Sequence, residues 1–323
     1  MHADYSHNNQ QHIFNNPMAK HPKKRARITC ESPAVVPLAP SAITQCPAEI
    51  WGRIFALACI DGGFTGRALS CVSRYIMETS RPYKYQCLTV TEQQFRPLTT
   101  ILKKLPADRR RIRYLFLAEE CWGNGYAGIG RASEFFHTDK NRLLQLAAAS
   151  LEVLEVGSRL YRFAVPFQLP VLVKLILHGY PDQIQPSRNI VACYPALRCL
   201  FVDNFPTMDG FNIPAVLNVT AINLAKVRLR IDDHAWARVL PQLKAMTQIQ
   251  KVLLQPKYGC ILHYKYLCGR LGLDSHLHDK IIMLKPSPSF TGRNRWSEVC
   301  SGRLDYWQPD ENEIDLAVAT DAS

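Results

Sequence analysis

Apolar residues recur at helical spacing in two short stretches between residues 46 and 82. The apolar face of the first stretch consists of Ile50, Ile54 and Leu57, widened by Trp51 and Phe55. Asp61-Gly62-Gly63 is expected to end this helix, and Thr65 to cap a second one whose face consists of Leu69, Val72 and Ile76. A third helical turn is predicted at Pro82. A unit of this size, residues 44–86, is too small to bury a large core alone.

Helical and strand patterns alternate after this unit. Thr91 to Gln94 fits a capping box and predicts a helix to Leu105. Six apolar triples, hydrophobic at positions 1, 4 and 6, predict strands that start at residues 112, 151, 172, 197, 219 and 249. Most of their spacings lie at or close to the period of leucine-rich repeats. A seventh triple, Leu224-Val227-Leu229, overlaps the fifth, and further helices are expected at 140–149 and 232–246.

The apolar pattern near the C-terminal end predicts which elements close the array of repeats. Lys280 to Leu284 alternates weakly as a strand. The apolar residues Trp296, Val299 and Trp307 indicate a closing helix that would cover the last repeat. The predicted class is α+β, a three-helix unit followed by an irregular leucine-rich-repeat-like αβ solenoid. The predicted divisions are a disordered basic arm at 1–43, the helical unit at 44–86, the repeat domain at 87–304 and an acidic disordered tail at 305–323.

Composition supports a globular protein of 323 residues, 47% hydrophobic and 20% charged. These values exclude a wholly disordered chain, a collagen-like repeat and a disulfide-stapled miniprotein. The apolar runs are too short for a membrane span, and the first residues lack the pattern of a secretory signal. Eleven cysteines without a CxxC pair indicate reduced thiols in a cytoplasmic or nuclear protein.

The net charge of +12 is unevenly placed. Residues 1–45 carry +3 and residues 305–323 carry −6, which leaves +15 for the rest. This basic body fits a solvated surface, or a surface for nucleic acid or acidic partners. A cluster in the arm is typical of a nuclear-localisation signal, although a solubilising arm explains it equally; it consists of Lys23, Lys24, Arg25 and Arg27.

Two further motifs have residues that could carry chemistry. Gly123 to Gly128 has the spacing of a dinucleotide fingerprint, but Glu119-Glu120 stands between strand and glycines and would repel a pyrophosphate. A surface loop is the preferred interpretation. Five possible ligands, Cys260, His263, Cys268, His276 and His278, do not have the spacing of a zinc site. We therefore expect no metal site, no cofactor and no enzymatic activity.

The helical unit resembles an F-box. Pro47 to Phe55 matches the pattern PxEIWxxIF, and Gly63 to Pro82 is similar to GFTGRxLSxVSRYIxETSRP, both found in F-box proteins that mushroom-forming fungi carry in large numbers. The family usually opens with Leu-Pro, whereas this chain has Cys46-Pro47. The resemblance implies a non-enzymatic substrate-recognition subunit of a cullin-based (SCF-type) E3 ubiquitin ligase. The F-box would bind a Skp-type adaptor, and the repeat domain would bind a protein substrate.

Seven apolar residues are predicted to contact the adaptor, although some of them must face the unit's own core. They are Pro47, Ile50, Ile54, Phe55, Leu69, Val72 and Ile76. The expected location is the cytoplasm, the nucleus or both. The alternatives are a basic nucleic-acid-binding protein and a scaffolding protein without a ligase role.

Overall fold

The computed structural model describes eleven stretches of the chain, all within one unit, Cys46–Ser323. They are residues 46–118, 132–157, 167–178, 194–205, 221–231, 239, 241–243, 246–256, 280–285, 293–301 and 307–308. The predicted arm at 1–43 lies outside the described residues. So do nearly all of the acidic tail at 305–323 and most of the helix predicted at 232–246.

Three short helices begin the described chain: α2 (Ala48–Ala58), α3 (Phe64–Leu69) and α4 (Arg74–Ser80). The single helix predicted through Leu69, Val72 and Ile76 is therefore wrong, because the chain breaks at Ser73. The hydroxyl of Ser73 accepts a hydrogen bond from the N–H of Ile76 at 3.2 Å, which is the geometry of a helix N-cap. The predicted third turn is confirmed as the 3₁₀ helix η1 (Arg81–Tyr83).

The start of α3 also differs from the prediction. Asp61, rather than Thr65, supplies the capping oxygens: the backbone N–H of Thr65 donates to Asp61 Oδ2 at 2.9 Å, and its hydroxyl donates at 2.6 Å. Gly62 and Gly63 have φ values of +76° and +94°, in the left-handed region that favours glycine. This turn carries the chain from α2 into α3.

The three helices bury a small core of their own. Phe55, Cys59 and Ile76 are buried there, and Trp51 stacks on Phe55 with ring centroids 5.4 Å apart. The side-chain amide of Gln86 donates to Ala56 O at 2.7 Å and so joins α2 to the chain that enters the sheet.

Within the described residues, eight parallel strands form one sheet, in which each strand pairs with the next along the chain. They are β1 (Cys87–Thr91), β2 (Tyr114–Ala118), β3 (Val153–Gly157), β4 (Lys174–His178), β5 (Cys199–Phe205), β6 (Lys226–Ile231), β7 (Lys251–Pro256) and β8 (Ile281–Met283). Parallel neighbours need a crossover between strands, so the fold is mixed α/β. The α+β prediction is correct only in its mixture of helices and strands.

The register of the sheet corrects one predicted strand. Val227 pairs with Leu200, so the triple that enters the sheet is Leu224-Val227-Leu229, and the start at Val219 is wrong. β1 was not predicted as a strand at all. It pairs Leu88 with Leu115. Its triple begins with the aromatic residue Tyr85, whereas the predicted triples consist of Leu, Ile and Val alone.

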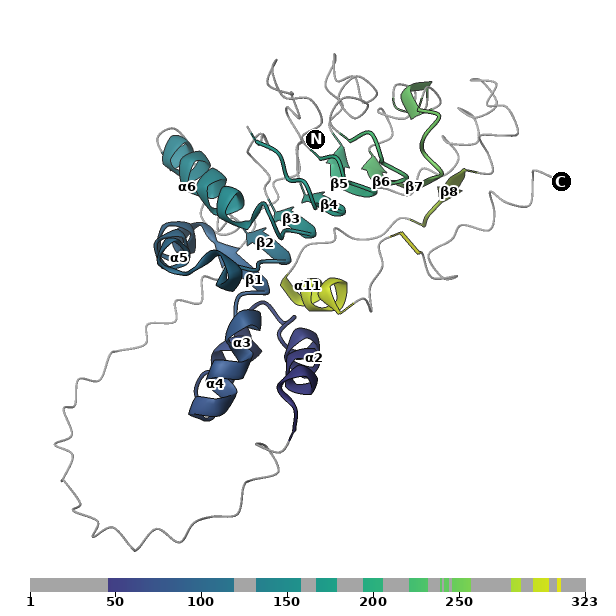
Figure 1. Ribbon diagram of the computed structural model, residues 1–323. Helices are drawn as coiled ribbons and strands as arrows, with labels where there is room; N and C mark the ends of the chain where they lie inside the picture. Colours follow the sequence, from purple (N-terminus) through teal and green to yellow (C-terminus); the bar gives the residue numbers. More distant parts are fainter. Residues whose placement is uncertain are drawn as a thin grey trace, which may run out of the picture. The chain divides into compact units, whose positions relative to one another are not determined.

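Helices cover the two faces of the sheet. Leu115, Leu154 and the residues in register with them share a buried core with α5 (Glu92–Lys104) and α6 (Ala132–Ala147). The capping box predicted for α5 is confirmed, since Thr91 N–H donates to Gln94 Oε1 at 3.1 Å. A 3₁₀ turn, η2 (Ala107–Arg109), lies between α5 and β2. Figure 1 shows α5 and α6 together beside the first strands.

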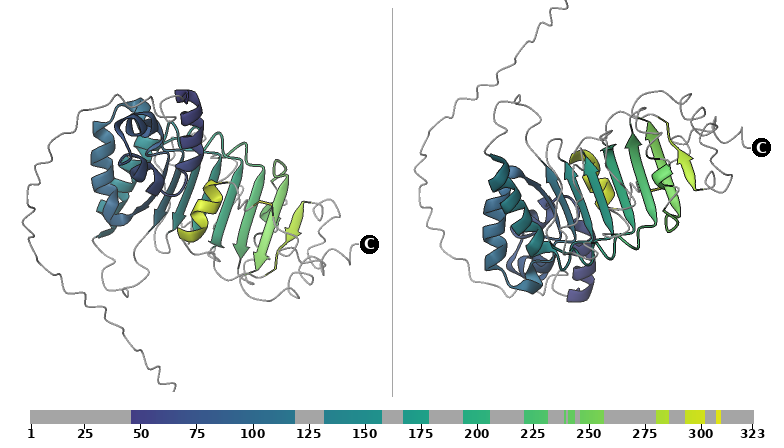
Figure 2. Two further views of the ribbon diagram at one scale, coloured as in Figure 1. Left: turned by 90° about the horizontal axis from the view of Figure 1, so that it is seen from below. Right: turned by 90° about the horizontal axis from the view of Figure 1, so that it is seen from above.

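The last helix, α11 (Arg293–Cys300), covers the opposite face, over the first strands of the sheet. Its Trp296 ring lies 5.7 Å from the ring of Phe116 on β2, and Cys300 Sγ lies 3.5 Å from Cys87 Sγ on β1. Figure 2 shows the helix crossing the strands. The predicted role as a cap on the last repeat is therefore wrong, because α11 returns to the beginning of the sheet.

Candidate interaction surfaces

The outer face of α2 presents a stripe of uncovered apolar side chains. Ile50 and Ile54 are each 44% exposed and Leu57 is 74% exposed. Their spacing of four and three residues places them along one side of the helix. Since α2 already buries Phe55 on its inner side, this second apolar stripe does not serve the core of the helical unit.

The seven predicted adaptor-contact residues divide between surface and core. Pro47, Ile50, Ile54 and Val72 are exposed, Val72 at 63%. Leu69 is half-buried and packs against the small core. Phe55 and Ile76 are almost completely buried, so they are the members of the set that face the unit's own core, where they hold the three helices together.

Three exposed apolar residues on α2, α3 and α5 were not among the seven predicted contacts, although Leu57 was already placed on the apolar face of the first helix. Leu57 continues the α2 stripe, while Phe64 on α3 and Ile101 on α5 are 59% and 47% exposed. The helical period signals Leu57, because it lies three residues after Ile54. Phe64 and Ile101 come from separate helices, and only the fold brings them to a common groove.

A buried polar cluster lies on the sheet face opposite α5 and α6. His178 Nε2 lies 2.8 Å from Glu155 Oε1, and His178 Nδ1 lies 3.4 Å from Asp203 Oδ2. Arg230 donates to the other oxygen of Asp203 at 3.2 Å. We refer to Glu155, His178, Asp203 and Arg230 as the sheet-face cluster. Such groups are retained in an apolar environment only when they are paired.

The pKa values in the sheet-face cluster follow from this pairing. Burial by itself lowers the pKa of His178, but its hydrogen bonds and charge attraction to Asp203 and Glu155 outweigh burial and raise it to about 9. Burial raises the pKa of Asp203, yet His178 and Arg230 lower it by a larger amount. The imidazolium form of His178, which donates from both nitrogens, is therefore the form at neutral pH.

The central strands of the same sheet face are not open. Ile176, Phe201 and Leu253 are fully buried in one cluster with Trp296 and Trp307. Lys174 Nζ lies 5.4 Å from the Trp307 ring centroid, and Lys251 Nζ donates to Trp307 O at 3.2 Å. A partner could reach these strands only if the C-terminal residues moved away.

Several sequence motifs lie outside the described residues. They are the basic cluster Lys23, Lys24, Arg25 and Arg27, the glycine motif at 123–128 and the cysteine and histidine group at 260–278. Within the described stretches, no group of three or more His, Cys, Asp or Glu is arranged to hold a metal ion. None of the helices in the described part of the chain combines the length and hydrophobicity needed to cross a bilayer.

Comparison with known proteins adds no constraint. No family model, no curated protein and no solved structure matches the chain significantly.

Proposed function

We propose that the chain is an F-box-type substrate-recognition subunit of a cullin-based (SCF-type) ubiquitin ligase. In this proposal the helices α2 to α4 form the F-box and bind a Skp-type adaptor. The remaining domain presents a protein substrate. The resemblance of residues 46–82 to fungal F-box proteins motivates this assignment, and the exposed apolar stripe of α2 is the observation that carries it.

The stripe supports docking on energetic grounds. Burying one large apolar side chain stabilises a complex by about 1.5–3 kcal/mol before the cost of association. Ile50, Ile54 and Leu57 leave three such side chains uncovered on consecutive turns of one helix. Contiguous exposed apolar surface on a folded unit is typical of a protein interface. A helical partner that presents a complementary groove fits this shape.

The second part of the proposal is that the sheet belongs to an irregular leucine-rich-repeat-like solenoid. Parallel pairing in strict chain order supports it, because repeat solenoids add one strand per repeat. With Leu224 replacing Val219 as a start, the last three spacings become 25, 27 and 25 residues. These values lie within the range of leucine-rich repeats.

In this function the chain makes or breaks no bond. It holds substrate lysines near a conjugating enzyme that the cullin assembly supplies, and so raises the effective concentration of those lysines at the enzyme.

The test is co-purification of the full chain with a Skp-type adaptor. Ile54→Asp places a charge in the middle of the stripe, and we expect at least about a thirtyfold loss of affinity, the size of a hot-spot substitution. Ile222→Asp is the matched control, because Ile222 is an isoleucine of similar exposure, 55% against 44% for Ile54, in the turn before β6. Equal retention of the two variants, with unchanged thermal unfolding, would refute the adaptor assignment.

A further inference from the structure

A groove of about 290 Å³ lies where α3, β1 and α5 meet. Phe64 on α3 and Ile101 on α5 form part of its walls, and Leu88 and Val90 of the edge strand β1 contribute to its lining. The groove is distinct from the α2 stripe, since none of the stripe residues lines it. Figure 1 shows the three elements converging at the first edge of the sheet.

The tight turn before α3 holds this groove in place. A Cβ atom on Gly62 would lie 2.7 Å from Thr89 Oγ1, so only glycine lets the turn approach β1 this closely. The N–H of Thr89 donates to Gly62 O at 3.4 Å, which fixes the turn to the edge of the sheet. One side of the groove is therefore formed by backbone that is fixed to the sheet.

The charge of the groove has one sign. Arg67 and Lys84 belong to its lining, and the described residues that line it include no Asp or Glu. Neither cation forms an ion pair with another described residue; Arg67 lies over the Phe64 ring at 4.8 Å and Lys84 over the Tyr85 ring at 5.7 Å. The surrounding stretch, residues 46–118, contains twelve Lys or Arg and five Asp or Glu, a net charge of +7.

We propose that this groove binds an acidic peptide segment of a partner protein through one large apolar side chain and two or more carboxylates. The apolar side chain would cover Phe64 and Ile101, both of which are left exposed. The carboxylates would pair with Arg67 and Lys84, and the basic surroundings would attract the segment at a distance. The volume accommodates one such side chain with its adjoining backbone.

This groove offers the proposed ligase subunit a substrate site, which the covered sheet face does not. That role rests on the proposed function, whereas the binding of an acidic peptide does not. Arg67→Glu is expected to leave adaptor co-purification unchanged, and Ile54→Asp is expected to leave peptide binding unchanged. The two proposals can therefore fail separately.

The experiment selects short random peptides displayed on phage against the full chain, with counter-selection on the double variant Arg67→Glu, Ile101→Ser. Enriched peptides are then synthesised with a fluorescent label and titrated by anisotropy. We expect them to contain acidic residues beside Leu, Ile, Phe or Trp, and to bind more weakly as salt is raised. Arg67→Glu is expected to weaken binding at least about tenfold, the loss of one well-placed charge contact.

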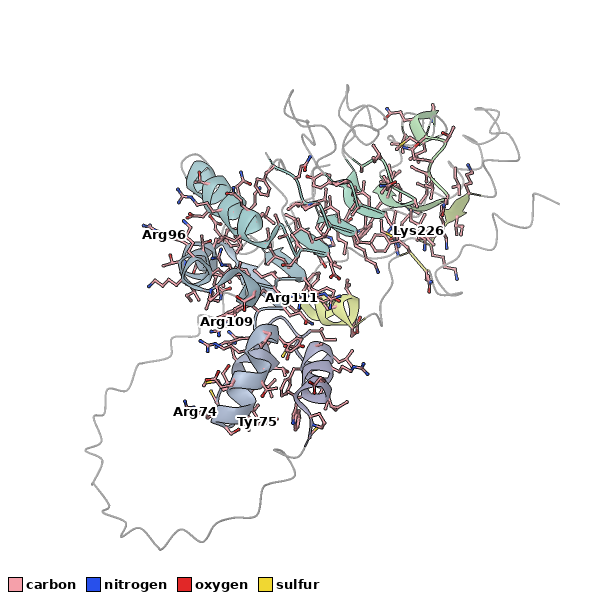
Figure 3. All side chains as sticks on the ribbon, in the orientation of Figure 1. Arg74, Tyr75, Arg96, Arg109, Arg111 and Lys226 are labelled. Atoms are coloured by element: carbon pink, nitrogen blue, oxygen red, sulfur yellow. The ribbon has the colours of Figure 1, made fainter. Side chains whose placement is uncertain are left out.

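Two matched controls separate the groove from general charge and hydrophobicity. Arg96→Glu reverses an exposed charge on α5 (Figure 3), which adjoins the groove, at a residue outside the groove lining, and should change the affinity less than about twofold, as expected of a rim charge. Val171→Ser removes an exposed apolar residue elsewhere, as the control for Ile101→Ser. The proposal is overturned by an absence of enriched peptides, by enrichment of basic peptides, by equal effects of Arg67→Glu and Arg96→Glu, or by a groove that binds oleate but no peptide.

Discussion

His178 illustrates how one ionisable side chain is kept charged inside an apolar sheet face. It lies on β4 between carboxylates from the two neighbouring strands, Glu155 on β3 and Asp203 on β5. The Phe201 ring lies edge-on at 5.9 Å and excludes water from one side. In such surroundings an opposite charge within hydrogen-bond distance outweighs the cost of burying the imidazolium.

The pKa of His178 predicts how stability depends on pH. Its folded pKa of about 9 lies above the unfolded value of 6.5, so the stabilisation is complete below pH 6.5 and is lost as the pH rises through about 9. The full loss is about 3 kcal/mol in the free energy of unfolding. Denaturant titrations of wild type and His178→Gln between pH 6 and pH 10 measure it. A stability difference that stays constant over this range would contradict the prediction.

At the level of single residues, the burial of the sheet-face cluster could not be predicted from the sequence. Glu155, Asp203 and Arg230 alternate with apolar residues along their strands, the pattern of a strand whose polar side faces water. The sequence does not show that a distant C-terminal helix would cover that side. The apolar positions of the other side were correctly predicted, because they repeat the same triple in almost every strand.

At the scale of elements, α3 lies unusually close to the chain that leads into β1. A Cβ atom on Gly66 would lie 2.7 Å from Lys84 O and 3.0 Å from Lys84 Cα, both backbone atoms that cannot move independently. The helix can therefore pack here only because residue 66 has no side chain.

Gly66→Ala is expected to destabilise the protein by about 1–3 kcal/mol, the usual cost of overpacking. Because alanine has a higher helix propensity than glycine, a net destabilisation by this substitution can be attributed to packing. Thermal unfolding followed by circular dichroism measures the change. Gly157→Ala is the matched control, since its Cβ would make ordinary contacts of 3.4 Å or more. Equal stability of the two variants would show that α3 is not held this closely.

The elements themselves were predictable where a local signal exists. The capping box at Thr91 correctly gave the start of α5, and seven of the eight described strands follow apolar patterns found in the sequence, including the weakly alternating Lys280 to Leu284, which contains β8. Two failures have different causes, one local and one not. Ser73 divides α3 from α4 because its side chain caps a new helix, and the choice between overlapping triples at Val219 and Leu224 depends on pairing with β5. The sequence of a single strand does not show which other strand it pairs with.

At the scale of the whole sheet, three layers are stacked: α5 and α6, the strands, and the C-terminal residues around α11. The third layer joins residues more than 200 positions apart, Cys87 and Cys300. Helical periodicity predicts the apolar residues of α11 but not the part of the fold that they contact, because a helix can cover either the end of an array of strands or its face. This layer closes the face that a repeat protein of open form would offer to a ligand.

Trp296→Ala should uncover this face and can be detected through the cysteines beneath it. Replacing a buried Trp by Ala costs about 3–5 kcal/mol, which would favour release of α11 from Phe116 and Cys87. We expect Cys87, fully buried in the wild type, to react with a thiol-specific reagent under native conditions in the variant. Peptide mass spectrometry identifies the labelled residue.

Two other cysteines make this labelling experiment decisive. Exposed Cys71 should react in both proteins, which confirms that the reagent is active. Cys59 is buried among α2 to α4, where burial raises its pKa to about 11, so it should stay protected unless the whole unit unfolds. Labelling of Cys87 without Cys59 means that the C-terminal layer opens while the helical unit remains folded. Labelling of both indicates a single cooperative structure, and protection of both shows that Trp296 does not hold the layer in place.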